Sequence, residues 1–241
     1  MGDALFEDPR LAAVYDVFDD DRRDLVAYLA VADELGAQVV LDLGCGTGTF
    51  ALLLATAGRT VIGVDPAVAS LDVARGEPGA DRVTWVHGDA RTLPDVRADL
   101  ATITGNVAQA IVEPADWEAT LRGTRDALRP GGHLVFETRD PARRAWTTWT
   151  RQAGRRTVVT GSGPVEHWWE VTDVDGPLVT LHGTWVFAAD GSVRTSRSTL
   201  RFPERAEVEH DLTRHGFRAV EVRDAPDRPG LELVFLAQRP G

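Results

Sequence analysis

A glycine-rich loop with an acid in front of it is the first place in this sequence where chemistry can be expected. Gly44, Gly46 and Gly48 alternate along "DLGCGTG", and Asp42 begins that stretch. Glycine loops often hold phosphate because the backbone can approach the ligand closely. The dinucleotide-binding pattern, however, needs its third glycine at position 49, where the chain has Thr49. An acid at Asp42 would also repel a pyrophosphate, so the loop argues against a dinucleotide site.

Further acids end the apolar runs that follow the loop. Asp65 ends "TVIGVD", and Asp89 ends "VTWVHGD". In doubly wound sheets, ligands bind beyond the carboxyl ends of the strands, and an acid about 20 residues after the glycine loop contacts the ribose hydroxyls. Each acid alone is equally well explained as a turn residue at the end of a strand. Their common order favours one binding site at the edge of a parallel sheet.

In that order, the loop, the two acids and "LRPGGHLVFE" resemble the class I S-adenosylmethionine-dependent methyltransferases of small molecules, motif by motif over residues 39–137. The resemblance implies S-adenosyl-L-methionine as cofactor and S-adenosyl-L-homocysteine as product. Asp42 then suits an ammonium group, and the helix that starts near Gly48 suits a carboxylate. Cys45 is expected as a small residue under the cofactor and not as a nucleophile. The cofactor-binding residues that the resemblance implies are Asp42, Gly44, Cys45, Gly46, Gly48, Asp65, Pro66, Gly88, Asp89, Ala90, Gly105, Asn106 and Tyr15.

The reaction implied by this family is an in-line displacement, in which the acceptor atom attacks the methyl group and the protein mainly supplies position. Some acceptors must also lose a proton. The catalytic candidates are Glu137, Asn106 and His167. Glu137 is the best-placed carboxylate for a base, although pairing with Arg139 would explain it as well. The sequence leaves open which atom is methylated. It also leaves open binding of the cofactor without methyl transfer, in a scaffold or in cyclisation or elimination chemistry.

Tryptophans, a glutamine and an arginine near the predicted strand ends indicate the acceptor pocket. If the antiparallel segment folds over these ends, its tryptophans would wall an apolar or aromatic substrate. For at least half of them, a core between the two sheets is the simpler explanation. Trp168 and Trp169 point to opposite faces of a strand, so only one of them is expected to face a substrate. The expected substrate-binding residues are Gln109, Arg139, Trp146, Trp149 and Trp168.

The elements that would position these residues alternate between strand and helix from residue 39 to residue 140. This rhythm predicts an α/β, Rossmann-like, doubly wound and mostly parallel sheet of seven strands. Alternating polar and apolar residues then predict an antiparallel β insert. We expect one domain over residues 1–241, made of an N-terminal cap (1–38), a cofactor-binding core (39–154), the insert as a substrate lid (155–202) and a helix with two strands that complete the sheet (203–241).

Composition limits the partners and the location of the protein. The formal net charge is -11, and the 26 basic residues are all arginines. The lack of lysine excludes Schiff-base chemistry, and a broad anionic surface disfavours nucleic acid. No apolar run reaches the roughly 20 residues of a membrane span, and the single cysteine suits the cytoplasm. We expect a small-molecule acceptor of aromatic or anionic character, no nucleic acid, membrane or metal, and we leave a homodimer open.

Overall fold

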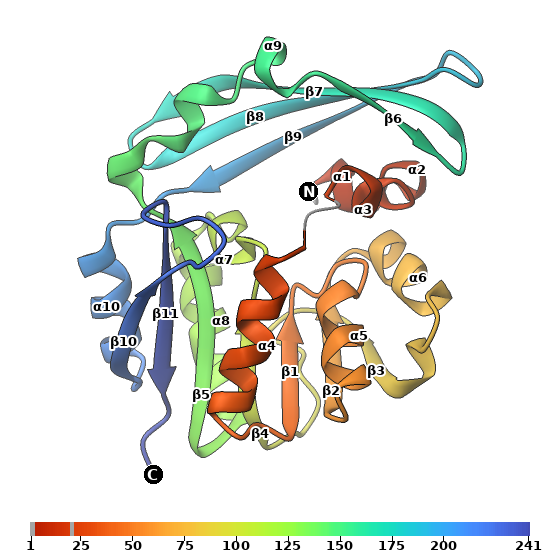
Figure 1. Ribbon diagram of the computed structural model, residues 1–241. Coiled ribbons are helices and arrows are strands. Elements are labelled where there is room, and N and C mark those ends of the chain that lie inside the picture. The colour runs from red at the N-terminus through yellow and green to blue at the C-terminus, as the bar shows by residue number, and fades with distance from the viewer. Residues whose placement is uncertain (1–2, 20–21) are drawn as a thin grey trace.

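The computed structural model describes residues 3–19 and 22–241, and its main body is a sheet of seven strands in the order β10-β11-β5-β4-β1-β2-β3 (Figure 1). Strands β1 to β5 are parallel, whereas β11 runs antiparallel to both β5 and β10. The predicted Rossmann-like, mostly parallel sheet is therefore confirmed. The strands are β1 (Val39–Leu43), β2 (Thr60–Asp65), β3 (Val83–His87), β4 (Ala98–Ile103), β5 (Leu128–Arg139), β10 (Arg218–Asp224) and β11 (Glu232–Gln238).

Helices cover both faces of this sheet because its central strands are apolar on both sides. Helices α4 and α5 enclose one core, which includes Leu100, and helices α8 and α10 enclose the other, which includes Phe136. Full burial of side chains of this size stabilises the fold by about 1.5–3 kcal/mol each. The helices of the main body are α4 (Asp24–Glu34), α5 (Thr49–Thr56), α6 (Val68–Gly76), η1 (Ala80–Arg82), α7 (Val107–Ala110), α8 (Pro114–Ala127) and α10 (Arg205–Arg214).

The step from α8 to β5 differs from the expectation drawn from the sequence. The pattern "LRPGG" predicts that the helix runs to the glycines, but α8 ends at Ala127 and β5 already begins at Leu128. Pro130 cannot continue a helix and favours an extended backbone just before it. The backbone of Gly131 and Gly132 then pairs with Arg239 beyond the end of β11. The proline and glycines are thus part of the strand.

A second, antiparallel sheet in the order β6-β7-β8-β9 lies across the carboxyl ends of the parallel strands (Figure 1). Its inward face carries the apolar residues that the alternation predicted, with Val165, Trp185 and Phe187 buried. The segment between β5 and β6 forms three short helical turns. The three turns are η2 (Pro141–Arg143), η3 (Ala145–Thr148) and α9 (Arg151–Gly154). The four strands are β6 (Arg156–Thr160), β7 (Gly163–Asp175), β8 (Leu178–Phe187) and β9 (Val193–Arg201).

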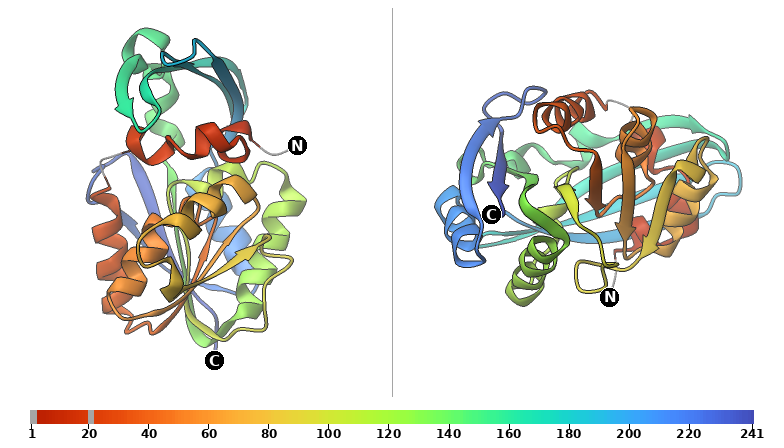
Figure 2. Two further views of the ribbon diagram at one scale, coloured as in Figure 1. Left: turned by 90° about the vertical axis from the view of Figure 1, so that its right-hand side faces the viewer. Right: turned by 90° about the horizontal axis from the view of Figure 1, so that it is seen from below.

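The N-terminal segment forms three one-turn helices, α1 (Ala4–Glu7), α2 (Pro9–Ala12) and α3 (Tyr15–Phe18). The side chains of Asp3 and Asp8 cap the first two. The helices lie between the second sheet and the main body (Figures 1 and 2). Turns this short have no periodic pattern that a sequence could reveal, which is why the cap was expected without assigned elements.

Candidate active site

The glycine loop joins β1 to α5, and two of its glycines pack closely against other side chains. Gly44 has a φ of +70°, and a Cβ there would lie 2.4 Å from Val107. Gly48 has a φ of +86°, and a Cβ there would lie 2.6 Å from Trp85. A Cβ on Gly46, in contrast, would meet nothing within 4 Å. The loop is therefore packed against the protein at both ends and open in the middle.

Two of the predicted cofactor acids lie at this loop. Asp42 is 1% exposed; its Oδ1 accepts a hydrogen bond of 2.9 Å from Thr102, while Oδ2 has no partner among the described residues. Burial raises the pKa of Asp42 to about 7. Asp65 accepts from the amides of Gly46 and Ala67, both at 2.8 Å, and burial raises its pKa as well. The two carboxylates thus meet the loop from adjacent strand ends.

The third acid and the cysteine behave differently. Asp89 lies half-buried beside the Arg91 guanidinium, which holds the pKa of that carboxyl below its usual value. Cys45 is buried, and burial raises the pKa of its thiol, so it stays a protonated, compact side chain. Of the other expected cofactor contacts, Ala90 is buried, while Pro66 is exposed and its carbonyl lies 3.1 Å from Nε2 of His87.

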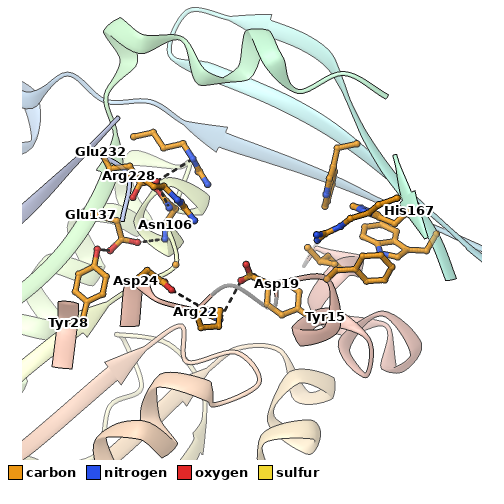
Figure 3. A pocket seen from close by; sticks show the side chains of 17 residues that line it. Tyr15, Asp19, Arg22, Asp24, Tyr28, Asn106, Glu137, His167, Arg228 and Glu232 are labelled. Carbon is orange, nitrogen blue, oxygen red and sulfur yellow. Dashed lines mark hydrogen bonds and ion pairs between the residues drawn. The ribbon is translucent and has the colours of Figure 1, made fainter. Parts of the chain in front are cut away.

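A cavity of about 290 Å³ lies between the strand ends, the N-terminal helices and the second sheet (Figure 3). It brings together residues far apart in sequence, whereas Asp42, Asp65 and Asp89 do not line it. Six of the predicted site residues do: Tyr15, Gly105, Asn106, Glu137, Arg139 and His167. Gly105 and Asn106 follow β4, which neighbours β1, so the cavity reaches the side of the sheet that carries the glycine loop.

Glu137, near the end of β5, is the central carboxylate of the cavity. It is 2% exposed, its Oε2 accepts a hydrogen bond of 2.7 Å from the Tyr28 hydroxyl, and its Oε1 accepts from the amide of Asn106. Burial raises the pKa of Glu137 to about 7, and burial beside this carboxylate raises the pKa of Tyr28 far above its usual value. A carboxyl group with a pKa near neutrality can accept and release a proton under ordinary conditions.

A second buried carboxylate, Glu232, lies beside it at the start of β11. Antiparallel pairing places Glu232 opposite Arg139, at 3.8 Å between Oε1 and Nε. Arg228 donates to the same oxygen at 2.7 Å, and Nδ2 of Asn106 donates to it at 3.2 Å. Asn106 therefore bridges the two glutamates, with its amide held to Glu137 and its side chain held to Glu232.

Gln109 does not line the cavity but contacts Arg139, which does. It is fully buried, its Oε1 accepts from the backbone and the guanidinium of Arg139 at 3.2 and 3.0 Å, and its Nε2 donates to the carbonyl of Arg201 at 2.8 Å. Gln109 thereby orients Arg139 and ties the core to the end of β9.

The second sheet closes the cavity with an aromatic wall around His167. This imidazole is 4% exposed, its ring centroid lies 5.1 Å from Phe18, 5.3 Å from Trp169 and 4.5 Å from Trp185. Neither ring nitrogen has a partner among the described residues. Burial, with the Arg156 charge nearby, lowers the pKa of His167 to about 4. The ring is therefore neutral at ordinary pH.

The structure corrects the choice of tryptophans. Trp169 lines the cavity, whereas Trp168 lies on the opposite face of β7, with the Arg151 guanidinium 4.3 Å from its ring. Trp146 and Trp149 pack on Phe202, at 4.6 and 6.1 Å between ring centroids, and do not line the cavity. Because side chains alternate along a strand, only one of Trp168 and Trp169 can face the cavity. The pairing of β7 with β6 and β8 turns Trp169 toward it.

The N-terminal helices form the remaining wall. Burial raises the pKa of Tyr15 to about 12. Arg22 lies 3.4 Å from Asp19 and from Asp24. Next to Tyr15, Asp16 accepts a hydrogen bond of 2.7 Å from Thr47 in the glycine loop. The segment that closes the cavity is thus in direct contact with the loop.

Sequence reasoning missed several residues of this site: Tyr28, Glu232, Arg228 and Arg22. Glu232 left a signal, because it is an acid at the start of the otherwise apolar run "ELVFLAQ". An acid at the edge of a buried strand indicates a partner or a site. Tyr28 and Arg22 left no such signal, because a tyrosine or arginine in a helix is equally at home in packing or in solvent.

Comparison with known proteins agrees with this arrangement. Residues 40–132 match a family model described as a methyltransferase domain. Part of the chain is 38% identical to the cypemycin N-terminal methyltransferase of a Streptomyces species, over 119 residues that make up 49% of this chain and 49% of that protein. The chain spans about half the length of the curated relatives it matches.

Several solved structures resemble nearly the whole chain. The sugar N-methyltransferase KedS8 of Streptoalloteichus superimposes with a TM-score of 0.78 at 20% identity, covering 100% of this chain and 96% of the other. CalS10 of Micromonospora echinaspora, an amino pentose methyltransferase solved with bound S-adenosylmethionine, gives a TM-score of 0.71 at 24% identity, with 94% and 96% covered. At these identities the likeness shows a shared fold.

Proposed function

We propose, on the premise that this chain belongs to the class I S-adenosylmethionine-dependent methyltransferases, that it moves a methyl group to a small-molecule acceptor held in the cavity between the two sheets. The cofactor of the family is S-adenosylmethionine. The observation that carries the proposal is the cavity itself, which contains Asn106, Glu137 and His167 together. Its volume of about 290 Å³ suits a small molecule rather than a polymer.

The glycine loop has the donors and acceptors that this cofactor requires. Oδ2 of Asp42, buried and without a hydrogen-bond partner among the described residues, would accept from the ammonium group. The first-turn amides of α5 would face the carboxylate, because the first turn of a helix lacks internal acceptors. Asp65 already accepts from two amides, but a carboxylate has about four acceptor positions, so two would remain for ribose hydroxyls. Tyr15 would close the methionine end.

The chemistry divides between cofactor and protein. When bound, the cofactor supplies a methyl group on a sulfonium sulfur, so that the acceptor lone pair can take the methyl carbon while the carbon–sulfur electron pair stays on sulfur, leaving S-adenosylhomocysteine. Glu137 would accept the proton that the acceptor loses, since its pKa of about 7 suits proton transfer near neutrality. Asn106 would orient the acceptor. His167, neutral at ordinary pH, would offer hydrogen bonds rather than take up a proton.

Cofactor binding and methyl transfer can be tested separately. Titration calorimetry with S-adenosylmethionine and with NAD should show heat of binding for the first alone. Isotope-labelled cofactor, incubated with the protein and a metabolite extract, should then yield S-adenosylhomocysteine and a labelled small molecule. Glu137→Gln should spare cofactor binding and slow the transfer, while Glu166→Gln, on the other face of β7, should change neither. Affinity for NAD alone would overturn the proposal, and cofactor binding without any transfer would point to the non-transferring alternative.

A further inference from the structure

The charges of the cavity are unevenly paired. Three of its four carboxylates contact arginines: Asp19 and Asp24 lie 3.4 Å from Arg22, and Glu232 lies 2.7 Å from Arg228. Glu137 is the exception within residues 3–19 and 22–241, because its contacts are the neutral donors Tyr28 and the Asn106 amide. A buried carboxylate without a cation is unfavourable. A ligand that brings positive charge would relieve this cost.

A second group beside Glu137 also needs a donor. Asn106 is 6% exposed, and its Nδ2 donates to Glu232, which identifies the other amide atom as the oxygen. That oxygen, Oδ1, has no hydrogen-bond partner in the part of the chain that the structure describes. The residue is held with a φ of 61° at the start of α7, so its position is set by the backbone. Figure 3 shows Asn106, Glu137 and Glu232 gathered on one side of the cavity. This side therefore presents acceptors that suit a ligand with several N–H donors.

The opposite side of the cavity has a different character. His167 lies on it (Figure 3). The rings of Trp169, Trp185 and Phe18 surround this imidazole. A neutral imidazole carries one donor and one acceptor, and both nitrogens of His167 lack partners among the described residues. The nearby cation, Arg156, is exposed and lies 5.3 Å over the Phe18 ring. This side suits an apolar or aromatic ring with a single polar group.

We propose that the acceptor is a primary or secondary amine carried on an apolar or aromatic ring. The ammonium binds between Glu137 and Asn106, and the ring packs against Trp169 and Trp185 within reach of His167. This inference rests on the proposed function and names its substrate class. One proton passes from the ammonium to the Glu137 carboxylate, which leaves a neutral nitrogen with a free lone pair and a neutral carboxylic acid. A carboxylate or phosphate at the reacting end would instead face Glu137 with like charge.

The charge preference can be measured without turnover. The protein is saturated with S-adenosylhomocysteine and titrated in a calorimeter with phenethylamine, 2-phenylethanol and 3-phenylpropionate, which share a ring and differ in the polar end. At about pH 8, with Glu137 ionised, we expect the amine to bind at least about tenfold more tightly than the alcohol, as a charge-assisted hydrogen bond implies. The carboxylate should bind weakest of the three.

Variants separate the two halves of the cavity. Glu137→Gln should abolish the preference for the amine over the alcohol, and Trp169→Ala should weaken both probes alike. Glu166→Gln serves as the matched control and should leave all three affinities unchanged. As a check that needs no substitution, the wild-type protein is also titrated at about pH 5.5, where protonation of Glu137 should reduce the amine preference.

Equal binding of amine and alcohol, tighter binding of the carboxylate, or no binding of the amine would each overturn the amine proposal. None of these results affects the titration with S-adenosylmethionine or the formation of S-adenosylhomocysteine from the metabolite extract. The substrate class and the methyl-transfer function can therefore fail independently.

Discussion

Two buried acids, Asp42 and Glu137, have the most consequential chemistry at the level of single residues. Each has a pKa of about 7, chiefly because burial disfavours the charged form. Neither forms an ion pair within the described ranges, although Asp42 has Thr102 and Glu137 has Tyr28 as hydrogen-bond donors. Side chains of this kind lower the free energy of unfolding wherever they are ionised, and a ligand that compensates their charge would restore it.

Glu137 should make stability depend on pH with a definite sign. Its pKa is higher in the folded than in the unfolded chain, so the folded state binds more protons between about pH 4.5 and pH 7 and the ligand-free protein loses stability as pH rises through that window. Glu137→Gln removes this loss. The free energy of unfolding of the variant should equal that of the wild type at about pH 4.5. At about pH 8 it should be higher, by on the order of 3 kcal/mol at most. Urea unfolding at both pH values measures the difference; a difference that does not change with pH would contradict the assigned pKa.

Asp65 should contribute directly to cofactor affinity. Replacing it with alanine removes a carboxylate that we assign to the ribose hydroxyls, at a cost of about 1.5–3 kcal/mol of binding free energy. Calorimetric titration with S-adenosylmethionine measures the loss. Asp72→Ala, an exposed acid on the neighbouring helix α6, is the control that should have no effect. Unchanged affinity in a folded Asp65→Ala protein would show that the ribose lies elsewhere.

At the level of elements, the N-terminal helices connect the second sheet to the glycine loop. On the side of the second sheet, Asp3 accepts from the hydroxyls of Ser196 and Ser198, and Arg10 lies 2.8 Å from Asp190. On the side of the loop, Asp16 accepts from Thr47. The N-terminal segment is therefore attached to the second sheet by several contacts and to the glycine loop through Asp16. Ligand binding at the loop can thus change the order of this segment.

Asp16→Ala should therefore loosen the segment from the loop while leaving it attached to the second sheet. We expect faster hydrogen exchange in residues 4–18 and weaker binding of S-adenosylmethionine, with about 0.5–1.5 kcal/mol lost for the hydrogen bond. Asp190→Ala, which removes a contact on the opposite side, should leave cofactor affinity unchanged. Identical exchange in Asp16→Ala and wild type would rule out this link.

The loop and the end of α5 provide a matched pair of glycines. Gly48 and Gly58 both have positive φ, +86° and +88°, but a Cβ on Gly58 would meet nothing within 4 Å. Gly58→Ala should thus cost only backbone strain, about 1–2 kcal/mol. Gly48→Ala adds a collision with Trp85 and should cost about 1–3 kcal/mol more. Chemical denaturation of both variants tests the comparison, and equal costs would show that Trp85 yields without strain.

For the whole molecule, ligand binding should stabilise the fold, because the cavity is formed by several layers of the protein. Any ligand that binds only the folded state stabilises it, by about 2.7 kcal/mol at a concentration 100 times the dissociation constant. S-adenosylhomocysteine should therefore raise the melting temperature of the wild type, and raise that of Asp65→Ala less at the same concentration. A thermal shift that is the same in both proteins would show that the stabilisation does not depend on the proposed cofactor site.

No helix in the described part of the chain is long and apolar enough to cross a membrane.

Local pattern was sufficient for the sheet and for the loop. The glycines from Gly44 to Gly48, the acids at or next to the ends of β1 and β2, and the alternation of strands and helices are all visible within short stretches. The resemblance to the family, and with it the cofactor, could therefore be inferred from the sequence. Glu137 could likewise be selected as a candidate base from the sequence, because its position follows from the end of one strand.

Contacts between distant stretches could be known only from the tertiary structure. The antiparallel return of β11 brings Glu232 beside Arg139, α4 brings the Tyr28 hydroxyl to Glu137, and the pairing of the second sheet turns Trp169 inward and Trp168 outward. Each of these depends on how elements pack after they form, which short-range residue patterns do not encode. The proposed cofactor site therefore rests on residues that short sequence patterns single out, while the proposed acceptor cavity forms only where three separate segments meet.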